Sequence, residues 1–385
     1  MPDTFLHGVE VVDIATGSRP IRTTRSSVIG LIGTAPAADA EAFPLDTPVL
    51  ISRRIDAANL GTAGTLPDAI DGIFDQIGAM VVMVRVAEGA TDAETLSNLI
   101  GGIDEDTGAP VGVHTFLGAH SVVKVSPKIL IAPGFSQSAP LVEEMKPIAT
   151  RLRAIIIADG PNSTSADAVT YKEAIAHKRV YLIDPHIKVW DTTEDKEVLR
   201  PASAHIAGVW AKSDEERGWW HSPSNRLING VLGTARPIDF GWGDVNSTTN
   251  FLNGRWVSTI VQRDGYRAYG NRATDGSFVK DTRIHDMIAE AIQRSHFWAV
   301  DRNADRQYFE NVIGGVNTFG RSLINRGVVA GFECWADPDL NTPEALADGW
   351  VYFNYDYAAT PTAERITFRA MINSGYLTNV LPVAA

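Results

Sequence analysis

The sequence contains a single cysteine, Cys334, among its 385 residues. One cysteine excludes an internal disulfide, and it also excludes a metal centre built from several thiolates. No stretch approaches the roughly 18 apolar residues of a membrane-spanning helix, so we expect no membrane partner. The N-terminal sequence MPDTFLHGVE lacks the basic and apolar regions of a secretion signal, which predicts a chain that folds in a reducing cytoplasm.

Positive charge is also scarce, because 34 Lys and Arg face 46 Asp and Glu, for a formal net charge of −12. This balance argues against a general nucleic-acid binder, which needs a basic surface to displace counterions. The segment 255–326 departs from it, with 11 Lys or Arg against 8 Asp or Glu. We therefore expect surfaces of opposite sign that face different partners. With 44% hydrophobic residues, the chain is long enough to fold into more than one domain.

The first part of the chain alternates between apolar runs of strand length and segments with helical spacing. Such alternation indicates an α/β layer with a largely parallel sheet covered on both faces. The expected strands are Ser26–Pro36, Ala79–Val86, Lys128–Gly134, Arg153–Gly160 and Arg179–Pro185. The expected helices are Leu66–Ile77, Ser138–Leu152 and Ser165–Lys178.

After Ser222 the pattern changes, and Asn, Gly, Arg and aromatic residues become frequent. Two long helices are expected there, Asp281–Val300 and Arg306–Gly327, and two strands close the chain, Gly349–Ala359 and Ala363–Ala370. The second helix has an apolar stripe with polar residues on the opposite face. The stripe consists of Val312, Val316, Phe319 and Leu323, and the polar face carries Asn317, Arg321 and Asn325.

A short strand is also expected at the N-terminus, over Gly8–Ile14. Its side chains alternate, so that Val9 and Val11 lie on one face and Val12 and Ile14 on the other. A strand that is apolar on both faces at the end of a chain is an aggregation hazard unless it is paired. It therefore needs a partner strand.

Motifs that carry chemistry are scarce. Gly30 and Gly33 follow a strand, as in a phosphate-binding loop, but neither nucleotide-binding signature is present. Asp184, His186 and Asp191 lie close in sequence, yet no nucleophile elbow accompanies them. We assign no catalytic, cofactor-binding or metal-binding residue. An α/β enzyme acting on a nucleotide or sugar phosphate remains an alternative, supported by the sheet pattern and the Gly30–Gly33 turn.

Several specific segments resemble the tail sheath proteins of contractile-tail phages and R-type bacteriocins. The first is GWWHSPSNRLINGVLG, at 218–233, followed by FLNGRWVSTIVQRDGYRAYGNRAT, at 251–274. The similarity continues through 323–353 and ends with PTAERITFRA, and upstream it includes 107–136. It therefore covers nearly the whole chain.

This resemblance implies a structural protein that needs no cofactor. The implied fold is a largely parallel-sheet α/β outer region plus an α+β domain near an inner tube, with extended arms at both ends. The expected division is an N-terminal arm at 1–24, the outer region at 25–221, the tube-proximal domain at 222–356 and a C-terminal arm at 357–385. Subunits of this kind polymerise helically around a tail tube, and they contract to drive it through a cell envelope.

The implied partners are neighbouring copies, the inner tail tube protein, the baseplate and the tail terminator. The particle would be a virion tail or a bacteriocin, assembled in the bacterial cytoplasm; the sheath of a related injection or secretion machine is the alternative. The terminal arms would pair with strands of other copies. The arm residues expected at these contacts are Val9, Val11, Val12, Ile14, Ile366 and Phe368. The residues expected to face the tube are Asn317, Arg321 and Arg326.

Overall fold

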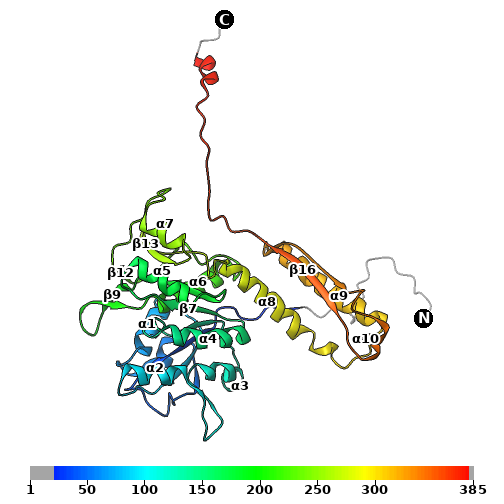
Figure 1. Ribbon diagram of the computed structural model, residues 1–385, viewed down its shortest axis with the longest axis horizontal. Coiled ribbons are helices and arrows are strands. Elements are labelled where there is room, and N and C mark those ends of the chain that lie inside the picture. Colours follow the sequence, from blue (N-terminus) through cyan, green and yellow to red (C-terminus); the bar gives the residue numbers. More distant parts are fainter. Residues whose placement is uncertain (1–20, 381–385) are drawn as a thin grey trace, which may run out of the picture.

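A six-stranded sheet with strand order β2-β3-β1-β6-β7-β8 forms the centre of the larger part of the molecule. The computed structural model describes residues 21–380 (Figure 1). Strands β1, β3, β6, β7 and β8 run parallel, and β2 is antiparallel to β3. Their bounds are β1 Ile29–Thr34, β2 Pro48–Ile51, β3 Val81–Val86, β6 Ile129–Ile131, β7 Ile155–Asp159 and β8 Val180–Ile183. The expected parallel α/β region is confirmed.

Helices cover both faces of this sheet, as continuous apolar strands require. On one face, α1 (Leu66–Phe74) and α6 (Ser203–Arg217) complete a core that includes Trp210 and Tyr181, whose rings contact edge to face. The other face packs on α2, α4 and α5. The remaining helices on this side are bounded as follows: α2 Asp92–Ile100, α3 Ala119–Val123, α4 Ala139–Leu152 and α5 Ser165–Ala174.

Short hairpins and one small helix extend the sheet layer, and together with the sheet they form the α/β body. They are β4 Gly102–Ile103, β5 Pro110–Val111, β9 Ile187–Asp191, β10 Lys196–Arg200, β11 Arg226–Leu227, β12 Val231–Thr234, β13 Thr259–Gln262, β14 Tyr266–Tyr269 and α7 Thr248–Asn253. Leu252, Val257 and Ile260 from this late region fill the two cores of the body. The segment 222–278 therefore belongs with the α/β body, which differs from the expected boundary at 221.

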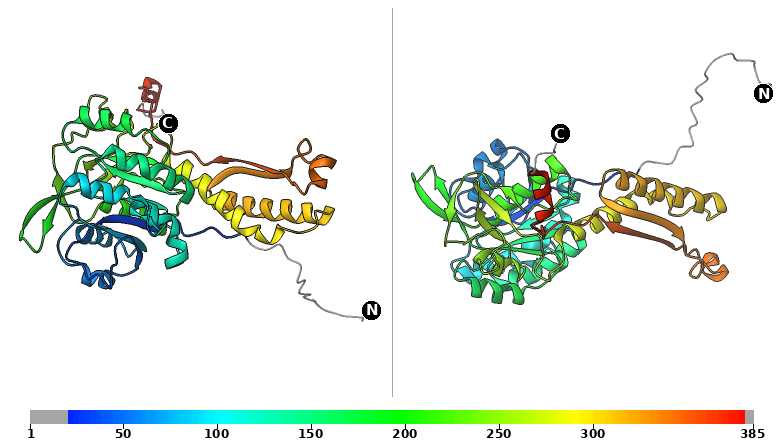
Figure 2. Two further views of the ribbon diagram at one scale, coloured as in Figure 1. Left: turned by 60° about the horizontal axis from the view of Figure 1, so that its bottom comes forward. Right: turned by 90° about the horizontal axis from the view of Figure 1, so that it is seen from above.

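A separate lobe begins at Val279 (Figures 1 and 2). It consists of α8 Val279–Ser295, α9 Arg306–Asn325, β15 Val329–Ala336, α10 Pro343–Ala347 and β16 Phe353–Ala359. Ile284 and Ile288 of α8, Phe319 and Leu323 of α9, and Val329 of β15 form its own small core. Both long helices expected here are confirmed, and Gly327, with φ of 72°, follows α9 in the left-handed conformation typical of a helix end.

One face of α8 ties the lobe to the α/β body through buried ion pairs. Arg283 pairs with Asp214 of α6, Asp286 pairs with Arg179 before β8, and Glu290 pairs with Lys128 before β6. The three α8 side chains are three and four residues apart, so they lie along one face of the helix. The helix therefore joins the two parts by charge on one face and by apolar packing on the other.

Beyond Ala359 the chain leaves the lobe and extends away from both parts of the molecule (Figure 1). Residues 360–373 form no strand or helix, and a 3₁₀ helix follows at Ser374–Val380. The arm therefore begins at Thr360 rather than at 357, because Tyr357 and Ala359 still pair with β15. Among the described helices, none has the length and apolar character that crossing a membrane would require.

Candidate subunit interface

Within residues 21–380, the hairpin of β15 and β16 is a two-stranded sheet, and α9 covers one of its edges. Phe332 of β15 lies so close to Gly320 of α9 that a Cβ at Gly320 would come within 2.2 Å of its ring. Phe332 also stacks on Tyr355 across the hairpin, with ring centres 5.8 Å apart. These contacts hold α9 beside β15, as Figure 2 shows.

Asn317 closes the outer edge of β15. Its Nδ2 donates to the carbonyl of Cys334 at 2.9 Å, and its Oδ1 accepts from the Cys334 N–H at 2.8 Å. The amide thus takes the place that a residue of an adjoining strand would occupy. Both hydrogen-bonding groups of the expected tube-facing residue Asn317 are used inside the lobe.

The other edge of the hairpin, along β16, is open within residues 21–380. Cys334 and Tyr355 are directly opposed, and the backbone groups of Cys334 point away from Tyr355 toward Asn317. The two are therefore a non-hydrogen-bonded pair, and the N–H and C=O of Tyr355 point to the outer edge of β16. Phe353 and Tyr357, two residues away on either side, have the same orientation. An open edge of this kind can accept another strand.

The extended C-terminal segment has the features of such an incoming strand. Ile366 and Phe368 alternate with polar residues, and they are 70% and 91% exposed. The base of the segment is fixed, because Arg272 binds Glu364 at 2.7 Å and Lys280 donates to the carbonyl of Thr360. The strand expected at Ala363–Ala370 has no partner strand among the described residues.

The remaining expected interface residues differ in their surroundings. Arg321 is exposed on α9, where its guanidinium donates to the Thr318 hydroxyl at 2.8 Å. Arg326 lies at the end of α9, with its guanidinium 4.5 Å from the ring centre of Trp220. Both remain predictions as tube contacts. Val9, Val11, Val12 and Ile14 lie outside the described residues.

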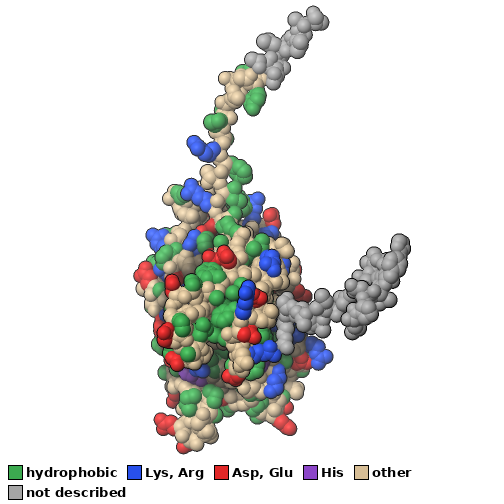
Figure 3. Space-filling view, turned by 90° about the vertical axis from the view of Figure 1, so that its right-hand side faces the viewer, with side chains coloured by type: hydrophobic (Ala, Val, Ile, Leu, Met, Phe, Trp, Pro, Cys, Tyr) green, Lys and Arg blue, Asp and Glu red, His purple; other side chains and the backbone are tan. Residues whose placement is uncertain are grey.

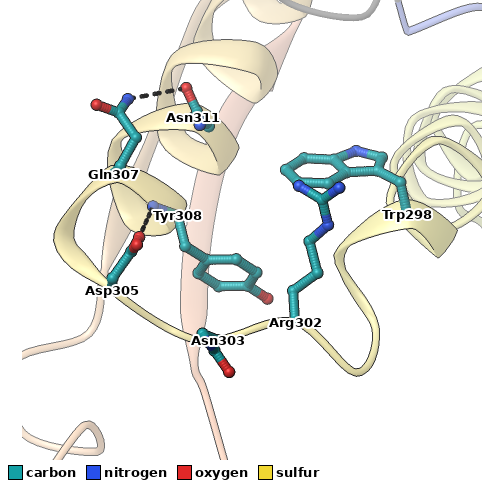
Figure 4. Close-up of a pocket in the computed structure, with 7 residues that line it drawn as sticks. All are labelled: Trp298, Arg302, Asn303, Asp305, Gln307, Tyr308 and Asn311. Carbon is teal, nitrogen blue, oxygen red and sulfur yellow. Dashed lines mark hydrogen bonds between the residues drawn. The ribbon is translucent and has the colours of Figure 1, made fainter.

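A shallow hollow lies where α8 leads into α9, and Figure 4 shows its lining. Arg302 lies over the Trp298 ring, and Asp305 accepts from the N–H of Tyr308 at 2.7 Å as the cap of α9. Gln307 donates to Asn311 at 3.1 Å on the next turn of the helix. These contacts stabilise the start of α9. The polar groups of this hollow do not converge on a common point that a substrate could occupy.

The residues considered for chemistry have structural contacts instead. Gly30 and Gly33 lie inside β1 rather than in a loop after it, and a Cβ at Gly30 would come within 2.7 Å of Leu130. Asp184 pairs with Arg236, whereas Asp191 binds Arg200 at 2.6 Å. No group of three or more potential metal-ligating side chains occurs within residues 21–380. The phosphate-loop interpretation of Gly30–Gly33 is therefore wrong, because the tight spacing serves strand packing.

Sequence reasoning missed the edge of β16 and the role of Asn317. Both depend on α9 lying beside β15, and residue spacing does not reveal which helix covers which strand. One signal was available: the chain has no Lys or Arg between Arg326 and Arg365. A long segment in which all charged residues are acidic follows a basic segment, and this change of charge marks the hairpin as a distinct surface.

Three family models match successive segments of the chain. They are the tail sheath protein Gp18 domain III N-terminal region at 26–86, the phage tail sheath protein central domain at 110–274, and the phage tail sheath C-terminal domain at 274–373. The boundary between the last two falls close to the start of the lobe.

Curated relatives match over almost their full length. A prophage major tail sheath protein of Pseudomonas aeruginosa is 39% identical, and the match covers 99% of this chain and 100% of that protein. The tail sheath protein of Escherichia phage P2 is 33% identical over 98% of both chains.

Two solved structures share the fold. The sheath complex of an extracellular contractile injection system in the contracted state, PVC, has a TM-score of 0.72 at 17% identity, and the match covers 97% of this chain and 99% of that one. The contracted helical sheath of the anti-feeding prophage also has a TM-score of 0.72, at 18% identity, with 96% of this chain and all of that one covered.

Proposed function

The chain belongs to the phage tail sheath family, and from this premise we propose that its copies assemble by strand exchange into a helical sheath that contracts. The observation that carries the proposal is that the chain has both an open strand edge and a separate segment able to pair with such an edge. The outer edge of β16 lacks a neighbouring strand within residues 21–380, and the segment around Ile366 and Phe368 has apolar side chains at strand spacing without a partner.

The pairing is proposed to occur between copies. The segment directly follows β16, and its base is held by the bonds to Glu364 and Thr360, so that it points away from the hairpin it leaves (Figure 1). Addition to the β16 edge of another copy forms backbone hydrogen bonds, and the apolar side chains set the register. Donor and acceptor surfaces differ, so the contact does not close on itself, and it builds a helical array.

The N-terminal residues Val9, Val11, Val12 and Ile14 are proposed to add a further strand to the same composite sheet. We expect the first incoming strand to add at β16, since Asn317 and α9 close the β15 edge. A second strand can then pair with the first. Two arms from other copies would link each lobe to its neighbours.

Contraction requires no bond hydrolysis in this proposal. The extended lattice is metastable and is held by a kinetic barrier until the baseplate releases it. Subunits then rotate and slide as rigid bodies into a wider, shorter lattice. Each further 1,000 Å² of apolar surface buried contributes roughly 25 kcal/mol before large opposing terms, so that a small net gain per subunit, summed over a long sheath, drives the tube.

The subunit has the internal connections that rigid-body motion needs. Three ion pairs hold α8 to the α/β body, and the opposite face of α8 lies in the core of the lobe. The joints are therefore proposed to lie in the arms, beyond the ion pair of Arg272 with Glu364. Body and lobe would move together.

The contact with an inner tube is proposed to involve Arg321 and Arg326, in contact with an acidic tube surface. A polar contact suits this role because the tube must later be released. Replacing both arginines with Glu should abolish co-assembly with the tube protein while leaving self-assembly intact. Unimpaired co-assembly would remove these residues from the interface.

We propose that the particle is a phage tail or a related contractile injection machine, with a baseplate and a terminator as further partners and no catalytic activity. The full-length match to phage and prophage relatives favours a phage-type tail, while the shared fold with injection-system sheaths supports the wider class. Negative-stain microscopy of the purified chain tests the central proposal. Long hollow polymers are expected, whereas uniform small oligomers with nucleotide-dependent melting would support the enzyme alternative.

A further inference from the structure

A basic groove lies where the α/β body meets α8. It is a hollow of about 550 Å³ between the chain leading into β1, the segment after α3 and the side of α8 that faces the α/β body. Its basic side chains are Arg22, Arg25, His120, Lys124, Lys128 and Arg294. On a chain with a net charge of −12, such a concentration of positive charge marks a site for an anionic partner.

Within residues 21–380, little of this positive charge is neutralised. Among these residues Glu290 is the single carboxylate lining the groove, and Lys128 already binds it at 2.6 Å. Arg294 reaches the same carboxylate at 3.6 Å, with its side chain 59% exposed. Arg22 and Lys124 are exposed, so the groove presents an excess of cations to solvent.

The turn that connects β15 to β16, at the tip of the lobe, has the opposite character. Residues 337–352 include four acidic residues and no Lys or Arg. The exposed Arg306, at the start of α9 near the same end, is paired with Glu310. Asp339, Glu344 and Asp348 are exposed around α10. Trp350, 60% exposed, adds apolar surface beside these carboxylates, and Figure 3 looks onto this end of the molecule. Acidic and apolar groups together form a surface suited to contact with another protein.

Groove and tip do not meet within one chain. The tip lies at the end of the lobe farthest from the α/β body (Figures 1 and 2). The groove lies at the root of the lobe, because residues of the body and of α8 line it. Among the salt bridges of residues 21–380, none joins them. Two surfaces of opposite charge at opposite ends of one lobe favour head-to-tail contact between copies, because the tip of one copy can reach the root of the next.

We propose that the acidic tip of one copy docks in the basic groove of a neighbouring copy. This contact rests on the proposed self-assembly, and it is separate from strand exchange because it uses side-chain charge rather than backbone pairing. The groove lies next to the start of the N-terminal arm at Arg22, so docking would fix the direction in which that arm leaves. Charge pairing then selects the correct neighbour before the arms pair.

The test is a charge swap in the full-length chain. The groove variant carries K124E and R294E, and the tip variant carries D339K and E344K. We expect each to raise the critical concentration for polymer formation by about tenfold, because every altered pair replaces attraction by repulsion. The combined four-substitution variant should return to within about threefold of the unaltered chain, since opposite charges again face each other.

A matched control reverses two exposed lysines of the α/β body that lie outside the groove, as K178E with K196E. It changes the net charge by the same amount, and it should leave the critical concentration unaltered. Sedimentation and negative-stain microscopy measure polymer formation, and circular dichroism checks folding. If the charge reversal in the groove variant impairs folding, the milder variant K124Q with R294Q replaces it in the test. This variant should raise the critical concentration for polymer formation by a few fold.

The outcomes separate the contact from the function on which it rests. Absence of polymers from the unaltered chain would overturn the proposed function, and the docking contact with it. Normal polymers from the groove variant would overturn the docking contact alone. Defects in both variants without recovery in the combined one would also overturn it, and would assign the groove to a different anionic partner, such as the inner tube.

Discussion

Arg179 holds Asp286 through two hydrogen bonds, of 2.5 Å from Nη1 and 2.8 Å from Nη2. Each side chain is only 6% exposed, and the pair joins the strand layer of the α/β body to α8. A bidentate contact between guanidinium and carboxylate fixes both distance and orientation. The pair therefore sets the angle at which the lobe leaves the body.

Asp286→Ala should destabilise the folded chain by about 3–5 kcal/mol, because it leaves the Arg179 charge buried without its partner. Replacing both residues, as Arg179→Met with Asp286→Leu, should recover most of this loss, since no uncompensated charge remains. Urea unfolding measures both free energies. A single variant as stable as the unaltered chain would show that the pair does not hold α8 to the body.

Ile366→Asp with Phe368→Asp should abolish polymer formation without affecting the stability of the subunit. Both side chains are exposed in the single chain, so their replacement should change the free energy of unfolding by less than about 0.5 kcal/mol. In the assembly they would be buried, and each buried apolar side chain contributes about 1.5–3 kcal/mol. Negative-stain microscopy and urea unfolding of the same samples measure the two effects.

The control for this variant is Met371→Asp with Ile372→Asp. These residues are 91% and 104% exposed, but they lie beyond the expected strand Ala363–Ala370. Polymers should persist in the control. Equal loss of polymers in both variants would point to a general effect of negative charge on the arm rather than to pairing of the strand.

Asn317→Ala should cost about 1–3 kcal/mol, because it removes two hydrogen bonds and leaves the N–H and C=O of Cys334 without a partner. It should also loosen the packing around the Cys334 thiol, which is 3% exposed and whose pKa burial raises to about 11. Thiol-labelling rates then report the change locally, with faster labelling expected. Asn325→Ala, an exposed position on the same helix, is the matched control and should label at the original rate.

The central sheet was predictable because its strands are continuous apolar runs, as in Ala79–Val86, separated by helices with a clear apolar face. The end of the α/β body could not be predicted in the same way. The amino-acid composition changes after 221, but the chain continues to pack into the same body. Leu252 and Val257 lie in a segment rich in Asn, Ser and Thr, and their places in the core depend on helices distant in sequence.

The interface was predictable in part. Alternation around Ile366 and Phe368 indicated a strand, and the structure describes this segment without a partner strand within residues 21–380. The polar face of α9 suggested a surface for an external partner, yet Asn317 bonds to a strand 17 residues further along the chain. Spacing identifies the face of a helix, but it does not distinguish solvent from a neighbouring strand edge.

The stability of the chain should fall as the pH drops below 6.5, with His205 as a principal cause. This side chain of α6 is 5% exposed, and burial lowers its pKa from 6.5 to about 4. The unfolded chain therefore binds the proton more readily than the folded one between these values. Stability is fully present above pH 6.5 and is lost as the pH falls toward 4, by about 2 kcal/mol between pH 7.5 and pH 5.

His205→Leu removes this titrating group and keeps an apolar side chain at the site, so the difference in unfolding free energy between pH 7.5 and pH 5 should shrink by about 2 kcal/mol. Removing an exposed histidine as His120→Gln provides the matched control, and it should leave the difference unchanged. Urea unfolding at both pH values measures the effect. An unchanged pH dependence in the Leu variant would contradict this prediction. It would mean that burial does not penalise protonation of the His205 imidazole in the folded chain.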